Sequence, residues 1–253
     1  MCLVIVGWQQ HPKYPLIIAG NRDEFHARPT EAAHWWPDQP DILGGRDLQA
    51  GGTWLALHRK GRFATVTNYR DKETTSAKKR SRGHLVTEFL QGNETSESYL
   101  RSLDGTKYAG FNLLVFDGES LGWNSNRGDG IKLLPPGVYG LSNALLDSPW
   151  HKLLRAKSGL EAAIEEKTVN ASALFRLLSD REKAPVSQVD SARLPFATAH
   201  AISAPFIVLP DYGTRSSNVA LCDAAGSWQV RERRFDTSGA KTGESVFRFD
   251  KSN

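Results

Sequence analysis

The chain has 253 residues, a length that allows one domain with a substantial hydrophobic core, and we expect a single domain over residues 1–253. Hydrophobic residues make up 40% and charged residues 24% of the chain, a composition that excludes a wholly disordered protein. The net charge of +4 is too small and too dispersed to indicate nucleic-acid binding, and no apolar run approaches the roughly 20 residues that span a membrane.

The cysteines and histidines further narrow the class of protein. Only Cys2 and Cys222 occur, so no disulfide framework is built, and the opening residues carry no basic secretory leader. We therefore expect a cytoplasmic protein. The seven histidines show no ligand-like spacing, and we expect no metal site. The basic run at residues 78–82 is typical of a solvated loop.

In the first half of the chain, β-branched runs at residues 3–6 and 16–19 predict a hairpin, which the polar tetrad Asn21-Arg22-Asp23-Glu24 follows directly. Residues 26–52 are rich in Pro, Gly and Asp and predict a long ordered loop. The further expected elements are strands at 53–57 and 62–68 and helices at 82–90 and 97–103.

In the second half, the pattern predicts strands at 111–116, 120–123, 137–143, 214–221, 228–235 and 246–249, and a helix at 170–178. Another helix should begin near Pro149, capped by Asp147 or Ser148, with an apolar stripe that includes Leu153 and Leu154. Residues 181–200 lack periodicity and predict a mobile loop. Strand runs segregated from helix pairs favour an α+β fold, a four-layer αββα sandwich with helices outside and sheets inside.

Cys2 is the most informative residue because of its position. Methionine is commonly removed before a small residue, which would leave Cys2 with both a thiol and a free α-amine. The two groups have reference pKa values of about 8.5 and about 7.7 to 8.0, so near neutral pH the amine can take the proton of the thiol. One residue would then be nucleophile and general base. The alternative is a small buried residue that begins a strand.

Other polar residues end the expected strands. Arg22 could hold a carboxylate or lower the pKa of the thiol, and Asp23 could orient the α-amine, although a solvated turn with one ion pair fits as well. Asn68 and Asn143 carry neutral amide donors suited to an oxyanion hole, and the alternative for each is a strand-terminating turn. Arg215 opens a late strand as an anion clamp or a surface charge.

Seven short motifs together resemble one family. They are Met1-Cys2-Leu3, Asn21-Arg22-Asp23-Glu24, Gly51-Gly52-Thr53-Trp54-Leu55, Thr67-Asn68-Tyr69-Arg70, Ser81-Arg82-Gly83, Gly140-Leu141-Ser142-Asn143-Ala144 with Pro149-Trp150, and Tyr212-Gly213-Thr214-Arg215-Ser216-Ser217. In this order they resemble the NRDE family, also called the transport and Golgi organisation protein 2 family, over nearly the whole chain.

That family is similar to the N-terminal-nucleophile (Ntn) hydrolases, near the bile-salt hydrolase and penicillin V acylase group. The resemblance implies that Cys2 is the nucleophile, that Asn68 and Asn143 lie on the oxyanion side, and that Asp23 and Arg215 orient the site. Asn21 to Asp23 match a cluster that the group reads as Arg-Asn-x-Asp, whereas this chain reads Asn-Arg-Asp.

The expected function is hydrolysis of a non-peptide amide or thioester by Cys2, with no cofactor required and a small molecule as the partner. Asn21, Arg22, Glu24 and Trp54 would contact the substrate. Some family members are implicated in haem trafficking, so the alternative is a haem-binding protein that uses the same pocket without turnover. A third possibility is an adaptor with an inactive site.

Overall fold

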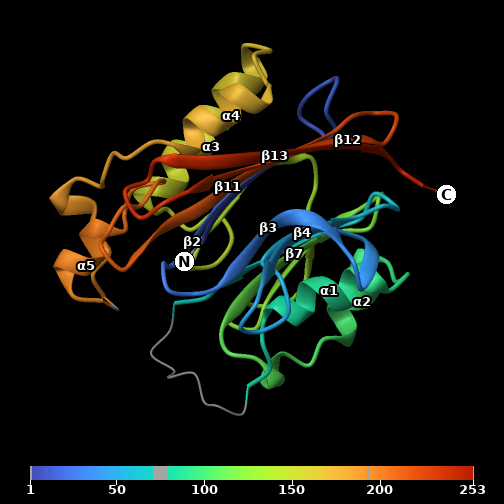
Figure 1. Cartoon of the computed structure of the whole chain (residues 1–253), viewed down its shortest axis with the longest axis horizontal. Helices are drawn as coiled ribbons and strands as arrows, with labels where there is room; N and C mark the ends of the chain where they lie inside the picture. Colours follow the sequence, from blue (N-terminus) through green and yellow to red (C-terminus); the bar gives the residue numbers. More distant parts are fainter. Residues whose placement is uncertain (1, 71–78, 193, 253) are drawn as a thin grey trace.

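Two antiparallel β-sheets lie face to face at the centre of the computed structural model, which describes residues 2–70, 79–192 and 194–252 (Figure 1). Sheet A has the order β10-β1-β2-β11-β12-β13 and sheet B the order β3-β4-β5-β6-β7-β8-β9. The strands of sheet A are β1 (Cys2–Trp8), β2 (Leu16–Phe25), β10 (Gly137–Leu141), β11 (Tyr212–Cys222), β12 (Ser227–Phe235) and β13 (Lys241–Asp250). Those of sheet B are β3 (Thr30–Trp36), β4 (Gln39–Asp47), β5 (Leu55–His58), β6 (Phe63–Asn68), β7 (Phe111–Phe116), β8 (Leu121–Ser125) and β9 (Lys132–Leu133).

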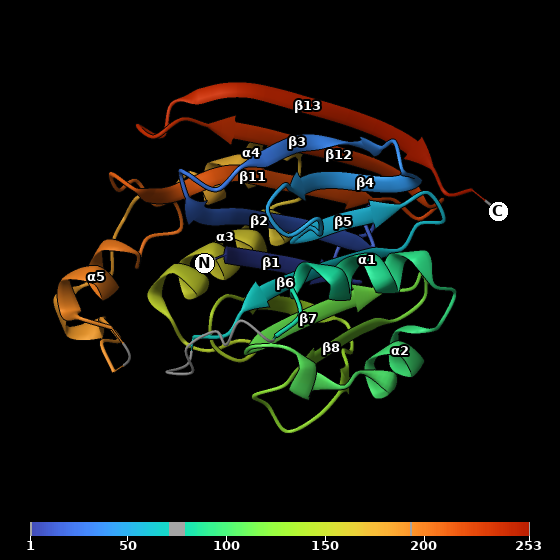
Figure 2. The ribbon, with the colours of Figure 1, turned by 60° about the horizontal axis from the view of Figure 1, so that its bottom comes forward.

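Helices cover the outer face of each sheet. α3 (His151–Glu165) and α4 (Ala171–Leu178) pack on sheet A, and α1 (Gly83–Gln91) and α2 (Ser96–Ser102) pack on sheet B (Figure 1). This arrangement confirms the predicted αββα sandwich. α5 (Phe196–Ala201) lies beyond the end of sheet A at which β1 begins (Figures 1 and 2). The short 3-10 helices are η1 (Gly105–Lys107) and η2 (Val186–Gln188).

The inner face of sheet A changes character along its strands. Directly paired residues of an antiparallel sheet share a face, so each cross-strand row can be read from the register. The row Val6–Ile18–Ala220–Val230 is apolar and belongs to the core between the sheets. The next row is Val4–Gly20–Asn218–Glu232, and the last is Cys2–Arg22–Ser216–Arg234. The sandwich is therefore apolar at one end and polar at the end where β1 begins.

The prediction of a loop over residues 26–52 was wrong, because β3 and β4 occupy most of this segment. The register between these strands shifts between Glu31 and His34 and again between Trp35 and Trp36. Each shift interrupts the two-residue alternation that identifies a strand in a sequence. The predicted hairpin of β1 and β2, both helix pairs and the closing strands are confirmed within a few residues.

The start of α3 also differs from the prediction. Its N-cap is Trp150, with no capping hydrogen bond from a side chain, whereas the Asp147 carboxylate accepts from Gly140 N at 2.8 Å. Leu154 is half exposed, and Lys152 is buried instead. The span 181–200 contains η2 and most of α5. Within the described ranges, every helix is too short or too polar to cross a membrane.

Candidate functional site

A cleft of about 620 Å³ opens between the two sheets at their polar end. Cys2 and Arg22 border it from sheet A, and Trp54 and Asn68 border it from the sheet B side. Glu24 also borders the cleft, and Arg82 adds a cation from the segment before α1. With Asp23, six predicted site residues therefore border one cavity, although they come from four separate stretches of the chain.

Cys2 begins β1 and is partly exposed. Its carbonyl oxygen accepts a hydrogen bond of 2.8 Å from Ser142 Oγ, which ties the start of β1 to the end of β10. Burial raises the pKa of the Cys2 thiol above its ordinary value and outweighs the opposing charge of Arg22 and a hydrogen bond from the Asp23 backbone. The thiol is therefore protonated at neutral pH, and a base must remove its proton before it can act as a nucleophile.

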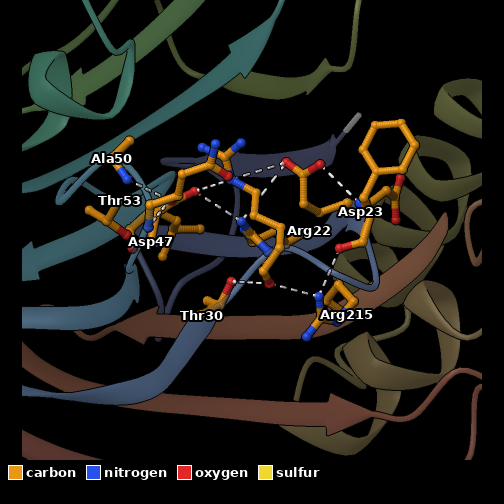
Figure 3. A network of polar contacts seen from close by, with 12 residues as sticks. Arg22, Asp23, Thr30, Asp47, Ala50, Thr53 and Arg215 are labelled. Atoms are coloured by element: carbon orange, nitrogen blue, oxygen red, sulfur yellow. Dashed lines mark hydrogen bonds and ion pairs between the residues drawn. The ribbon is translucent and has the colours of Figure 1, made fainter. Parts of the chain in front are cut away.

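Arg22 anchors one wall of the cleft through Asp47. Its Nη2 lies 3.3 Å from Asp47 Oδ2, which also accepts a 2.6 Å hydrogen bond from Arg28 Nε (Figure 3). Asp47 Oδ1 accepts from the backbone N–H groups of Gln49 and Ala50 at 3.1 and 3.0 Å. Burial acts to raise the pKa of Asp47, but these hydrogen bonds hold it below its ordinary value.

Asp23 lies next along β2 and is 1% exposed. Its Oδ1 accepts a 2.7 Å hydrogen bond from Thr214 Oγ1, and its backbone oxygen accepts one of 2.9 Å from the Tyr212 hydroxyl. Burial raises the pKa of the Asp23 carboxyl, and the positive charge of Lys152 opposes that rise. Asp23 is thus a buried carboxyl group that borders the cleft without lying open to solvent.

The ends of β6 and β10 bring the two predicted oxyanion asparagines together. Asn143 Nδ2 donates a 2.7 Å hydrogen bond to the backbone oxygen of Asn68, and Asn143 Oδ1 lies 3.3 Å from Ser142 Oγ. Asn143 is buried, whereas the Asn68 side chain is exposed and borders the cleft. Asn68 is therefore the amide donor with access to a bound molecule, and Asn143 fixes the strand end that carries it.

Two predicted site residues point elsewhere. Asn21 is fully buried, donates to the backbone oxygens of Leu178 and Pro205 at 2.8 Å each, and accepts from Ser217 Oγ at 2.6 Å. Arg215 is not among the described residues that line the cleft, and it donates to backbone oxygens. Those oxygens belong to Phe25, His26 and Arg28, at 2.9, 3.1 and 3.2 Å (Figure 3).

The expectation that Asn21 contacts substrate is therefore corrected by the alternation of β2, which turns Asn21 away from the cleft. The sequence prediction missed Lys152 and Ser142. Ser142 belongs to the motif that already indicated Asn143, whereas nothing in the sequence around Lys152 indicates a buried lysine. Among the described residues, no group of His, Cys, Asp and Glu could hold a metal ion.

Comparisons with known proteins place the chain in a family. The model of the family described as "Transport and Golgi organisation 2" matches residues 1–237. The chain belongs to this family. The Transport and Golgi organization protein 2 homologs of Bos taurus and Homo sapiens are 36% and 35% identical to it, each over 92% of both chains. The Drosophila melanogaster protein of that name is 30% identical over 88% of both chains.

A comparison with a solved structure shows which fold the chain has. This Transport and Golgi organisation 2 chain matches the C2A mutant of the conjugated bile acid hydrolase from Clostridium perfringens with a TM-score of 0.54. The match covers 100% of this chain and 98% of the other, at 9% sequence identity. The family member therefore has the Ntn-hydrolase fold that its motifs predicted.

Proposed function

We propose that this family member is a hydrolase that attacks a non-peptide amide or thioester with the thiol of Cys2. The observation that carries the proposal is the last polar row of sheet A, in which Cys2 and Arg22 face a cleft that Asn68 borders from sheet B. A thiol, a cation and a neutral amide donor around one cavity are the groups that acyl transfer needs.

The proposed mechanism begins with removal of Met1, which lies outside the described residues. The α-amine of Cys2 then takes the thiol proton, and the sulfur attacks the carbonyl carbon of the substrate. Asn68 donates to the oxyanion that forms. The protonated amine returns its proton to the departing amine or thiol, and the C–N or C–S bond breaks. Water then hydrolyses the acyl-cysteine thioester and restores the thiol.

The first test is the state of the N-terminus. Intact-mass analysis of the natively produced protein should show loss of Met1, and a cysteine-reactive probe at pH 8 should label Cys2 and not Cys222. Cys222 is an internal control because burial raises the pKa of its thiol to about 12. Retention of Met1 in a protein that hydrolyses amides or thioesters would refute the proposal.

The second test is a panel of simple amides and thioesters assayed with variants. Cys2→Ala should abolish turnover, and Asn68→Ala should lower kcat about 100-fold, since one oxyanion donor contributes about 3 kcal/mol in the transition state. Cys222→Ser should keep full activity because Cys222 lies at the other end of the sandwich, in the row with Trp8 and Trp228. Equal activity of Cys2→Ala and wild type would exclude the mechanism.

Haem binding in the same cleft is the second candidate, and the donor groups favour it. Arg28, Lys79 and Arg82 border the cleft and can pair with the two propionates, while Trp54 offers a flat apolar ring. No histidine is among the described lining residues, so Cys2 would hold the iron. Bound haem would supply an iron centre that a thiolate can ligate.

Titration with hemin distinguishes the two candidates. A carrier should give a saturable change in the Soret band. Cys2→Ser should shift that band yet keep most of the affinity, because the walls of the cleft remain, whereas hydrolysis should disappear in the same variant. A spectrum that never saturates would remove the haem candidate and leave the hydrolase proposal untouched.

A further inference from the structure

A second, smaller cavity lies between the start of α3 and the segment that carries η2 and α5. Its volume is about 30 Å³, and it has no lining residue in common with the cleft among the described parts of the chain. His151 and Lys152 border it from α3, and Arg70 borders it from the segment after β6. The cavity is therefore a separate candidate site, which does not depend on the hydrolase proposal.

Two nitrogen donors at this cavity are buried without an acceptor. Lys152 is the second residue of α3 and 2% exposed, and its Nζ forms no hydrogen bond with a described residue. The Nε2 atom of His151 is buried in the same unpartnered state. Burial of an ammonium group is costly unless an anion or a hydrogen-bond acceptor compensates it. A bound ligand with two acceptor atoms would satisfy both nitrogens.

The start of α3 adds positive charge to the cavity. The helix has 15 residues, and no side chain caps its N-terminus. An uncapped helix N-terminus carries a partial positive charge and attracts anions. The N-cap Trp150 and the first two residues of α3 all border the cavity, and the guanidinium of Arg70 lies 4.6 Å from the Trp150 ring. The donor groups and the helix end therefore favour a negatively charged ligand.

The acidic side chains nearby do not fill this cavity. Asp190 is the one acid among the described lining residues, and it is exposed and accepts from Ala192 N–H at 3.1 Å. Asp23 is not among those lining residues. Burial lowers the pKa of Lys152, the charge of Asp23 opposes this shift, and the charge of Arg70 lowers the pKa further. A bound anion would thus offset both the burial of Lys152 and its repulsion from Arg70.

The size of the cavity selects the kind of anion. One water needs about 10 to 15 Å³ of such a cavity, so about 30 Å³ admits two oxygen atoms and not the four of a phosphate. The rest of the described wall is mainly apolar and is formed by Trp150, Ala184, Val189, Ala199 and Ile202. We propose that this cavity binds a short-chain carboxylate of the size of formate or acetate, whose oxygens accept from Lys152 Nζ and His151 Nε2.

Thermal unfolding with sodium acetate tests the proposal, with sodium chloride at equal ionic strength as the reference. The Tm of wild type should rise saturably, by about 6 °C at 100 times the Kd. Lys152→Met should weaken acetate binding about 30-fold, because it removes a charge-assisted hydrogen bond. Lys157→Met is the matched control and should bind acetate like wild type, since Lys157 of the same helix pairs with Asp147 at 3.0 Å. Sodium phosphate should raise the Tm no more than chloride does.

A second pair of variants tests the cavity without removing a charge. Ala199 is 5% exposed and borders the cavity, so the larger side chain of Ala199→Leu should fill it and abolish the effect of acetate. Ala197→Leu, at an exposed position of the same helix, should keep that effect. This pair also gives the answer if Lys152→Met does not fold. Equal Tm increases in acetate, chloride and phosphate would overturn the proposal, as would an acetate effect that survives Ala199→Leu.

Nuclear magnetic resonance locates the bound acetate directly. The Hε1 signal of His151, assigned by its loss in His151→Gln, should shift saturably with the Kd that thermal unfolding gives. A titration in which this signal does not move would overturn the proposal. None of these measurements needs turnover or Cys2, so failure of the hydrolase assays and failure of acetate binding are separate results.

Discussion

Along β2, consecutive side chains point to opposite faces of sheet A, and this alternation gives neighbouring residues different roles. Arg22 and Glu24 face the cleft, where they meet Cys2 and Asp47. Asn21 faces the helical layer and forms three hydrogen bonds there. A substitution at Asn21 should therefore affect the stability of the sandwich, whereas a substitution at Arg22 should affect the wall of the cleft.

A pair of asparagine variants tests this separation. Asn21→Ala leaves two buried carbonyl oxygens and the Ser217 hydroxyl without their partner, so the free energy of unfolding should fall by about 3 kcal/mol. Asn68→Ala removes an exposed side chain and should change it by less than about 0.5 kcal/mol. Urea denaturation of both variants measures the difference. Equal losses would contradict the placement of these two side chains.

The sequence predicted which residues matter better than it predicted where they point. It indicated Cys2, Arg22 and Asn68, which do meet at the cleft. It treated residues 21–24 as one cluster after a strand, but β2 runs on to Phe25 and splits them between two faces. Polar residues at 21–24 resemble a turn in the sequence, because their burial depends on Ser217 and Thr214 of β11, nearly 200 residues away.

Between β4 and β5, the chain turns around a single carboxylate. Asp47 ends β4, accepts the N–H groups of Gln49 and Ala50 as an Asx turn does, and binds Arg22 and Arg28 with its other oxygen. The turn thus joins the wall that sheet B contributes to the end of β2 in sheet A. Its stability should depend on the charge of Asp47.

Asp47→Asn tests this dependence. Because the folded pKa of Asp47 is depressed, its contribution is present above the unfolded pKa and is lost as the pH falls through the folded pKa. The variant should lose about 2 kcal/mol of unfolding free energy at pH 7, and the difference from wild type should shrink below about pH 4. Urea titrations at pH 7 and pH 3 measure both. Asp38→Asn, which removes an exposed ion pair with Arg46, should behave like wild type at both.

At the level of helices and strands, the sequence pattern predicted the regular elements and missed the irregular ones. The strands β3 and β4 were not predicted because two register shifts interrupt the alternation of apolar and polar side chains over residues 30–47. The N-cap of α3 was predicted wrongly because the Asp147 carboxylate, although Asp is a common capping residue, accepts hydrogen bonds from Gly140 N–H and Lys157 Nζ instead. In both cases the deciding contacts join one element to its neighbour, β3 to β4 and the turn at Asp147 to β10 and α3, and the pattern within a single element does not carry them.

At the scale of the whole molecule, the packing of the two sheets determines where the core and the cleft lie. Apolar rows fill the space between them at one end, and polar rows leave a cleft at the other. The transition is sharp at Gly20, where an added Cβ would lie 2.8 Å from the backbone oxygen of Leu3 and 3.1 Å from the ring of Trp54. In the same cross-strand row, Glu232 of β12 accepts a 2.8 Å hydrogen bond from the backbone N–H of Ala33 in β3, which joins the sheets directly.

Glu232 should make this link sensitive to pH. Burial raises its pKa above the ordinary value, although Ala33 N–H and Arg234 oppose the rise. With a raised folded pKa, the contribution of Glu232 is fully present below its unfolded pKa and declines as the pH rises through the folded pKa. Glu232→Gln keeps an oxygen for the Ala33 N–H and carries no charge. The stability of Glu232→Gln relative to wild type should therefore increase from pH 4 to pH 8.

Glu232→Ala is the matched variant, because it removes the acceptor and leaves the Ala33 N–H buried without a partner. It should lose about 2 kcal/mol of unfolding free energy at pH 4 and less at pH 8, where wild type has itself lost part of the contribution of Glu232. Urea denaturation of both variants at the two pH values separates the charge from the hydrogen bond. If Glu232→Gln were as unstable as Glu232→Ala, the ionised carboxylate itself would hold the sheets together, and the polar end of the sandwich would depend on charge and not on the shared hydrogen bond.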